Sequence, residues 1–248
     1  MDLWAVSAII AAPFVGSFIG VLIERLPARR PVVLARSACD ACGRALGPLD
    51  LLPVVSWVSR RGRCGCGRTR LSPFYPLIEL AALAVALWAA FVVPGWIVLA
   101  SAALGWTLLA LAVIDQRHEI LPDVLTLPLI PAGLLVAWAI DPGRLADHVI
   151  GAAAGFLAFA AIAWVYHRLR GREGLGRGDA KLLAAAGAWL GWQALPSVVV
   201  IGAVAALALA LARAAAGAKL SAGMRIAFGP YLALGFWLVW LHGPLSFD

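Results

Sequence analysis

Charged residues are scarce in this chain. Only 13% of its 248 residues are Asp, Glu, Lys or Arg, whereas soluble globular domains carry about a quarter. Hydrophobic residues make up 63% of the chain and occur in long runs. This composition excludes a water-soluble domain and indicates an all-α, polytopic integral membrane protein.

The apolar runs are long enough to form helices that cross a bilayer, which takes about 20 residues each. We expect about eight transmembrane helices. The sixth and eighth runs are short and the sixth contains Gly187 and Gly191, so seven spans is the alternative. The expected spans cover approximately residues 3–23, 75–93, 96–114, 121–140, 149–166, 180–192, 197–216 and 226–241.

Basic residues are nearly absent from one side of the membrane in this arrangement. Of the 20 Lys and Arg, only Arg144 falls in a loop on that side. Because Lys and Arg accumulate in cytoplasmic loops, we expect both termini outside the cytoplasm and both Asp115 and Asp179 at cytoplasmic ends of spans. The net charge of +7 is then explained by topology and by attraction to anionic membrane lipid, without a nucleic-acid partner.

Three regions follow from this pattern: a first transmembrane span (1–24), a cytoplasmic loop (25–74) and a multi-span remainder (75–248). The first span has no basic region before it and no small-residue cleavage site after it, so we expect a retained anchor.

Cysteine is confined to the 25–74 loop, which holds all four: Cys39, Cys42, Cys64 and Cys66. Two close pairs about 20 residues apart resemble the knuckles of a zinc ribbon. The loop has little apolar material for a core, so a structural metal ion would supply folding free energy. The second pair is C-x-C, one residue short of the usual spacing, and reduced structural thiols are the alternative.

Acidic residues are rare near the spans, and two of them are candidates for catalysis. Asp179 ends a G-x-G-D tetrapeptide before the sixth span, and Asp115 ends the third. Ionisable groups near hydrocarbon are costly and indicate function, and a pair suggests acid–base chemistry. For Asp179 the alternative is helix capping, and for Asp115 it is a surface pair with Arg117 or His118. Asp123 is the competing candidate, although its place after a proline favours first-turn capping.

The chain carries an ordered set of motifs that resembles the motifs of a known family, the type IV prepilin peptidases. The similarity covers nearly the whole chain, including the cysteine loop. Its motifs are Gly16-Ser17-Phe18-Ile19-Gly20-Val21-Leu22-Ile23-Glu24-Arg25-Leu26-Pro27, Arg61-Gly62-Arg63-Cys64, Tyr75-Pro76-Leu77-Ile78-Glu79, Ile114-Asp115 with Leu121-Pro122-Asp123, the G-x-G-D ending in Asp179, and Phe228-Gly229-Pro230-Tyr231.

The resemblance implies a multi-pass aspartic endopeptidase of the bacterial inner membrane, with Asp115 and Asp179 as its catalytic carboxylates at the cytoplasmic face. It implies that the enzyme cuts the basic leader from type IV prepilins or pseudopilins and methylates the new N-terminal residue with S-adenosylmethionine. Gly20 stands where the family commonly has Asn, so a peptidase without methyltransferase activity is the closest alternative. The family's second cysteine pair is usually C-x-x-C.

Two other classes of function use the same features differently. In an ion- or proton-coupled transporter, the acids would form an ion path, but both lie at one interface rather than at the midplane. In an assembly factor without enzymatic activity, the cysteine loop would dock a prepilin without shortening it.

Overall fold

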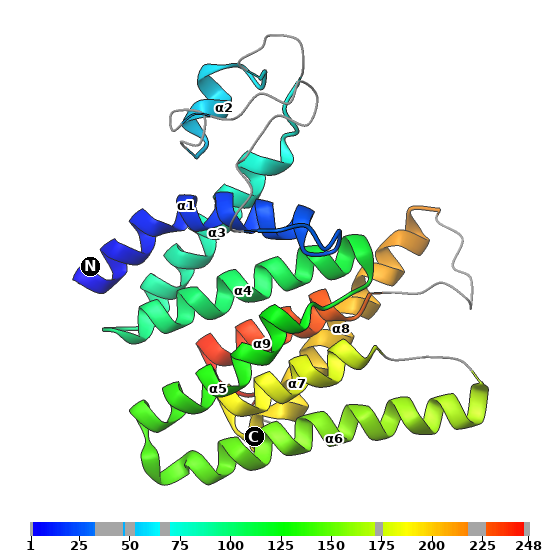
Figure 1. Ribbon diagram of the computed structural model, residues 1–248. Coiled ribbons are helices and arrows are strands. Elements are labelled where there is room, and N and C mark those ends of the chain that lie inside the picture. The colour runs from blue at the N-terminus through cyan, green and yellow to red at the C-terminus, as the bar shows by residue number, and fades with distance from the viewer. Residues whose placement is uncertain are drawn as a thin grey trace. The chain divides into compact units, whose positions relative to one another are not determined.

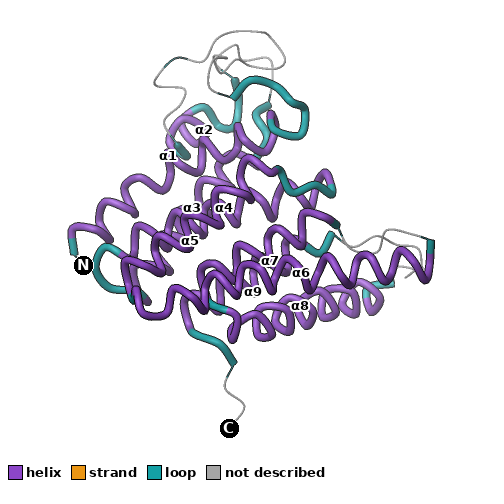
Figure 2. The backbone as a smooth tube through the Cα atoms, turned by 60° about the horizontal axis from the view of Figure 1, so that its bottom comes forward, coloured by secondary structure: helices purple, strands orange, loops and turns teal. Residues whose placement is uncertain are grey.

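The computed structural model describes residues 2–32, 47, 53–64, 70–171, 176–217 and 227–245. In these residues the chain forms helices and loops and no strand, as expected for an all-α protein (Figure 2). The elements are α1 (Leu3–Arg25), α2 (Val55–Ser59), α3 (Phe74–Val92), α4 (Ile97–His118), α5 (Asp123–Ile140), the 3₁₀ turn η2 (Pro142–Arg144), α6 (Leu145–Arg170), α7 (Arg177–Leu190), the 3₁₀ turn η3 (Trp192–Ala194), α8 (Leu195–Ala215) and α9 (Gly229–His242).

A helix occupies each of the eight segments expected to cross the membrane. Six of them, α1, α3, α4, α5, α6 and α8, are long and apolar enough to span a bilayer. The sixth and eighth segments, α7 and α9, have 14 residues each. At 1.5 Å per residue each measures about 21 Å, shorter than the roughly 30 Å of hydrocarbon. The polytopic all-α architecture is therefore confirmed, and the two segments expected to be short are short.

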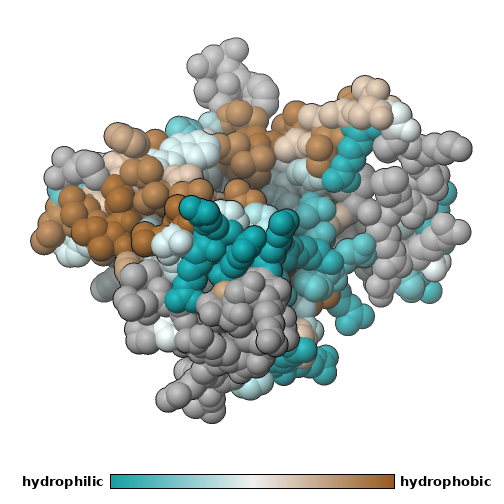
Figure 3. Space-filling view, turned by 90° about the horizontal axis from the view of Figure 1, so that it is seen from above, coloured by the Kyte–Doolittle hydropathy of each residue, from teal (hydrophilic) through white to brown (hydrophobic). Residues whose placement is uncertain are grey.

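Large apolar side chains lie on the outside of these helices, where a soluble protein would carry polar ones. Examples are Phe91, Leu135, Trp138 and Leu169, all more than half exposed. Broad apolar areas, coloured brown, are visible on the surface in Figure 3. Such surfaces require a lipid environment.

The chain forms two compact units, residues 1–106 and 107–248, and the boundary falls within α4. In the first unit α1 packs against α3 and crosses it (Figure 1). The helices approach so closely that a Cβ on Gly16 would lie 2.6 Å from the Cα of Glu79. Small residues allow close helix–helix packing in membranes, where burial of apolar surface gives no driving force.

In the second unit α7 is the central element. It packs against α5, α6 and α9, and ten of its 14 residues are buried. Two glycines of α6, Gly151 and Gly155, bring that helix against the backbone of α7. Trp189 of α7 donates a 2.8 Å hydrogen bond to the Leu129 carbonyl of α5 and stacks edge-on against Trp240 of α9, with ring centroids 5.0 Å apart. These contacts hold the middle and the last turn of α7 in place, and its first turn carries Asp179.

Candidate active site

Asp115 lies in the last turn of α4 and is 6% exposed. Its Oδ2 accepts a hydrogen bond of 3.0 Å from the backbone N–H of Gly229, the first residue of α9. The positive end of the α9 dipole therefore compensates for the unfavourable C-terminal end of α4. Arg117 and His118, considered as surface partners for Asp115, are themselves exposed.

Asp179 lies in the first turn of α7 and is 7% exposed. Its Oδ2 accepts a hydrogen bond of 3.1 Å from the N–H of Gly176, and its own N–H donates to the Gly176 carbonyl at 3.1 Å. Gly176 is the N-cap residue, so Asp179 reaches back to it as the acid of a capping box does. Capping is therefore present, and it leaves the carboxylate buried at a helix N-terminus.

The two acids are 64 positions apart in the sequence, and the fold brings them together. Both carboxylates are buried, Asp115 at the end of α4 and Asp179 at the start of α7. The loop after α4 also contacts the G-x-G-D turn, where a Cβ on Gly178 would lie 2.7 Å from the Cβ of Leu121. The second glycine of the tetrapeptide thus allows a close approach between these segments.

Asp123, the competing candidate, has a different environment. It is the first residue of α5, and its Oδ1 lies 2.6 Å from the Nζ of Lys181 in α7. The Asp123 side chain is 57% exposed. A solvated ion pair of this kind does not provide a buried acid with a shared proton, so the buried pair Asp115 and Asp179 is the better catalytic candidate.

Sequence reasoning assigned no role to two residues that the structure singles out. Gly229 was noted only as part of a motif, and it is the hydrogen-bond donor to Asp115. Glu79 of α3 is 6% exposed, belongs to the first unit and accepts a 2.7 Å hydrogen bond from the N–H of Val54. An acid inside the apolar run 75–93 was the signal available for Glu79.

The proposed zinc ligands fall mostly outside the described residues. Cys39, Cys42 and Cys66 lie in segments that the structure does not describe, while Cys64 is 4% exposed. Among the residues that are described, no three His, Cys, Asp or Glu side chains gather as metal ligands would. The zinc ribbon therefore stays a prediction.

The chain is similar to known proteins over most of its length. Residues 102–211, which include both acids, match the type IV leader peptidase family. Residues 10–93 match the bacterial peptidase A24 N-terminal domain. A protein of Burkholderia pseudomallei (strain K96243) is 44% identical over 230 residues, which cover 82% of this chain and 74% of the relative. The chain belongs to the type IV leader peptidase family.

Other members of the family match over a similar share of the chain at lower identity. A protein of Aeromonas salmonicida (strain A449) is 39% identical over 79% of this chain and 78% of its own length. One of Pseudomonas aeruginosa is 34% identical over 79% of this chain and 76% of its own length. All three relatives carry the name prepilin leader peptidase/N-methyltransferase. No solved structure matches the chain.

Proposed function

We propose that this member of the type IV leader peptidase family is a membrane aspartic endopeptidase that removes the leader from type IV prepilins or pseudopilins. One observation carries the proposal: Asp115 and Asp179 are both buried carboxylates, each bound by a backbone N–H at a helix N-terminus, and the loop that follows Asp115 packs against the turn that carries Asp179. The names of the relatives supply the substrate class.

Peptide hydrolysis follows from such a pair. Two neighbouring carboxylates cannot both ionise cheaply, so one keeps a proton while the other is ionised. The ionised carboxylate takes a proton from water as the water oxygen bonds to the scissile carbonyl carbon. The protonated partner donates its proton to the carbonyl oxygen. The C–N bond then breaks as its nitrogen accepts the proton taken from water, and the re-forming carbonyl returns the other proton to the partner carboxylate. The pair titrates as a unit, so the two roles are assigned to the pair and not to single residues.

Methylation of the new N-terminal amine is the second activity of the proposal. It rests on the names of the relatives and on the match of residues 10–93 to the N-terminal domain of the family. S-adenosylmethionine is the methyl donor that we propose. Gly20, where the family commonly has Asn, packs against Tyr75: a Cβ at position 20 would lie 3.4 Å from its Cδ1. A peptidase without methyltransferase activity is therefore the alternative that an experiment must exclude.

The location is part of the same proposal. The one-sided distribution of Lys and Arg favours a multi-pass protein of the bacterial inner membrane with Asp115 and Asp179 at the cytoplasmic face. Residues 75–248 form the peptidase part, and the 25–74 loop carries a structural zinc ion bound by Cys39, Cys42, Cys64 and Cys66.

Mass spectrometry of a prepilin incubated with the purified protein and S-adenosylmethionine tests both activities. We expect the wild type to remove the leader and to add one methyl group to the mature N-terminus. We expect Asp115→Asn and Asp179→Asn to leave the prepilin uncut while the protein stays folded in detergent. Cleavage by both variants at the wild-type rate would refute the aspartic mechanism. Cleavage without a methyl group would identify the peptidase-only alternative.

A further inference from the structure

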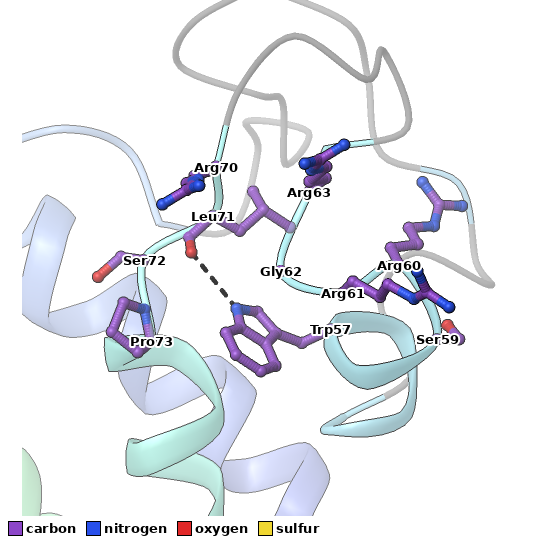
Figure 4. Close-up of a pocket in the computed structure, with 10 residues that line it drawn as sticks. All are labelled: Trp57, Ser59, Arg60, Arg61, Gly62, Arg63, Arg70, Leu71, Ser72 and Pro73. Atoms are coloured by element: carbon purple, nitrogen blue, oxygen red, sulfur yellow. Dashed lines mark hydrogen bonds between the residues drawn. The ribbon is translucent and has the colours of Figure 1, made fainter.

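A cavity of about 790 Å³ lies in the first unit, beside the start of α3 (Figure 4). The short helix α2 and the chain that follows it form one wall, and the segment leading into α3 forms the other. The lining residues are Trp57, Ser59, Arg60, Arg61, Gly62, Arg63, Arg70, Leu71, Ser72 and Pro73. Four of these ten residues are arginines, and none is acidic.

Hydrogen bonds between the two walls define the shape of the cavity. The Trp57 indole N–H donates to the Leu71 carbonyl at 3.4 Å, and the N–H of Leu71 donates to the Gly62 carbonyl at 2.7 Å. Arg63 and Arg70 form an isolated antiparallel bridge next to these contacts. The walls are therefore joined by backbone as well as side-chain bonds, so the cavity is a built feature of the fold.

The chain turns sharply at Arg61-Gly62, where both residues have left-handed backbone conformations, with φ of 51° and 68°. This conformation costs free energy at a non-glycine residue such as Arg61. It brings Gly62 against the Trp57 ring, since a Cβ on Gly62 would lie 2.9 Å from the ring atom Cζ2. Strained backbone of this kind clusters at ligand-binding sites, and here it shapes the wall that carries Arg61 and Arg63.

Three of the four arginines that line the cavity carry charge that no carboxylate in the described part of the chain neutralises. The exposed side chains of Arg61, Arg63 and Arg70 have no carboxylate partner among the residues that the structure describes. In Figure 4 the Arg63 and Arg70 side chains lie beyond Leu71 from the Trp57 ring. Guanidinium groups bind phosphate through paired N–H donors, so the ligand that this lining favours is a phosphate group.

The position of the cavity indicates that the phosphate belongs to a lipid headgroup. Ser72 and Pro73 line the cavity, and Pro73 is the N-cap residue of α3, a helix long enough to span the membrane. The cavity therefore lies where a span begins, at the depth of lipid headgroups. The first turns of α3 carry Leu77 and Leu80, which are 61% and 48% exposed and offer an apolar surface for acyl chains.

We propose that this cavity binds the phosphate of an anionic phospholipid, with Arg63 and Arg70 as its main ligands and the acyl chains along the exposed face of α3. Basic pockets beside transmembrane helices recognise anionic headgroups in this way. A bound lipid would fix the segment between α2 and α3 to the membrane surface. The site is independent of the Asp115 and Asp179 pair, so its test does not depend on peptidase activity.

Native mass spectrometry of the full chain in detergent, titrated with phosphatidylglycerol or phosphatidylcholine, tests the proposal. We expect the wild type to retain phosphatidylglycerol in preference to phosphatidylcholine, and Arg63→Gln/Arg70→Gln to bind it at least tenfold more weakly. Arg170→Gln/Arg213→Gln removes two exposed arginines elsewhere and is the matched control, with affinity expected within twofold of wild type. Arg63→Lys/Arg70→Lys keeps the charge without the paired donors and should fall between the two.

Three results would overturn the proposal. Equal losses of phosphatidylglycerol affinity in the cavity variant and in the control would show that the lipid is held by general attraction between charges and not by this cavity. Inorganic phosphate that displaces phosphatidylglycerol at equal concentration would assign the site to free phosphate. Displacement by S-adenosylmethionine or by a prepilin peptide would assign the cavity to the enzyme's reactants. Melting temperatures equal to wild type in all variants exclude loss of folding as the cause.

Discussion

The backbone N–H of Gly229 donates a 3.0 Å hydrogen bond to Oδ2 of Asp115, although 114 positions separate the two residues. The contact joins the last turn of α4 to the first residue of α9. It places a buried carboxylate at the positive end of a helix dipole, which favours its ionised form. The position of Asp115 thus depends on α9 as much as on its own helix.

Replacement of Gly229 by Ala should disable cleavage while keeping both acids. A Cβ at this position would lie 2.5 Å from Oδ2 and 2.9 Å from Cγ of Asp115, so the carboxylate has to move. A displacement of about 1 Å costs roughly a hundredfold in rate, and we expect a loss of that order in prepilin cleavage.

Gly20→Ala is the control for the Gly229 substitution. The added methyl group at position 20 makes an ordinary contact at 3.4 Å with Tyr75. It should leave cleavage within about twofold of wild type, a difference worth less than roughly 0.5 kcal/mol. Full cleavage by Gly229→Ala would show that the carboxylate does not need its present position.

The Asp123→Asn variant tests whether the solvated acid, rather than the buried pair, is needed for cleavage. Asp123 contacts Lys181 at 2.6 Å, but its side chain is 57% exposed, and surface pairs contribute only about 0–1 kcal/mol. We expect cleavage within about twofold of wild type, a difference below roughly 0.5 kcal/mol. Kinetic assays of Asp123→Asn beside Asp115→Asn and Asp179→Asn check this. If Asp123→Asn abolished cleavage and Asp115→Asn did not, the catalytic assignment would move to Asp123.

The sequence allowed prediction of the spans because hydrophobic length is a local property. The shortness of α7 and α9 was also visible, as short runs at 180–192 and 226–241. Local patterns did not reveal what brings Asp115 to Asp179, since this depends on how α7 packs among α5, α6 and α9.

Gly229 illustrates the same limit on sequence reasoning. Nothing in Phe228-Gly229-Pro230-Tyr231 indicates which distant carboxylate its N–H binds. Glu79 was visible as an acid within an apolar run, but its partner, the N–H of Val54, lies in a loop without regular periodicity.

Zinc content is the direct measurement for the cysteine loop. If the four cysteines hold a metal ion, elemental analysis should give about one zinc per chain. Cys39→Ser and Cys66→Ser should lose it and lower the melting temperature, because metal binding contributes to folding. Ser37→Ala is the neighbouring control and should keep the metal. Active wild-type protein without zinc would favour the alternative of reduced thiols.

Gly155→Leu should disrupt the central helix of the second unit. A Cβ on Gly155 would lie 2.5 Å from the Leu183 carbonyl oxygen of α7, so a leucine there forces α6 and α7 apart. Overpacking typically costs about 1–3 kcal/mol, and more where two backbones meet. Ala153→Leu inserts the same side chain two positions away, at an exposed site on α6, and should leave stability within about 0.5 kcal/mol.

Both leucine variants should be measured for melting temperature in detergent and for the rate of prepilin cleavage. Together these two measurements distinguish a loss of folded structure from a loss of catalysis. Because α7 carries Asp179, the Gly155 variant should lose cleavage together with thermal stability, whereas the Ala153 variant should keep both. A Gly155→Leu protein that melts like wild type would contradict the close packing of α6 on α7. One that melts early but cleaves normally would show that Asp179 is held by its own capping turn, through Gly176, rather than by the helix behind it.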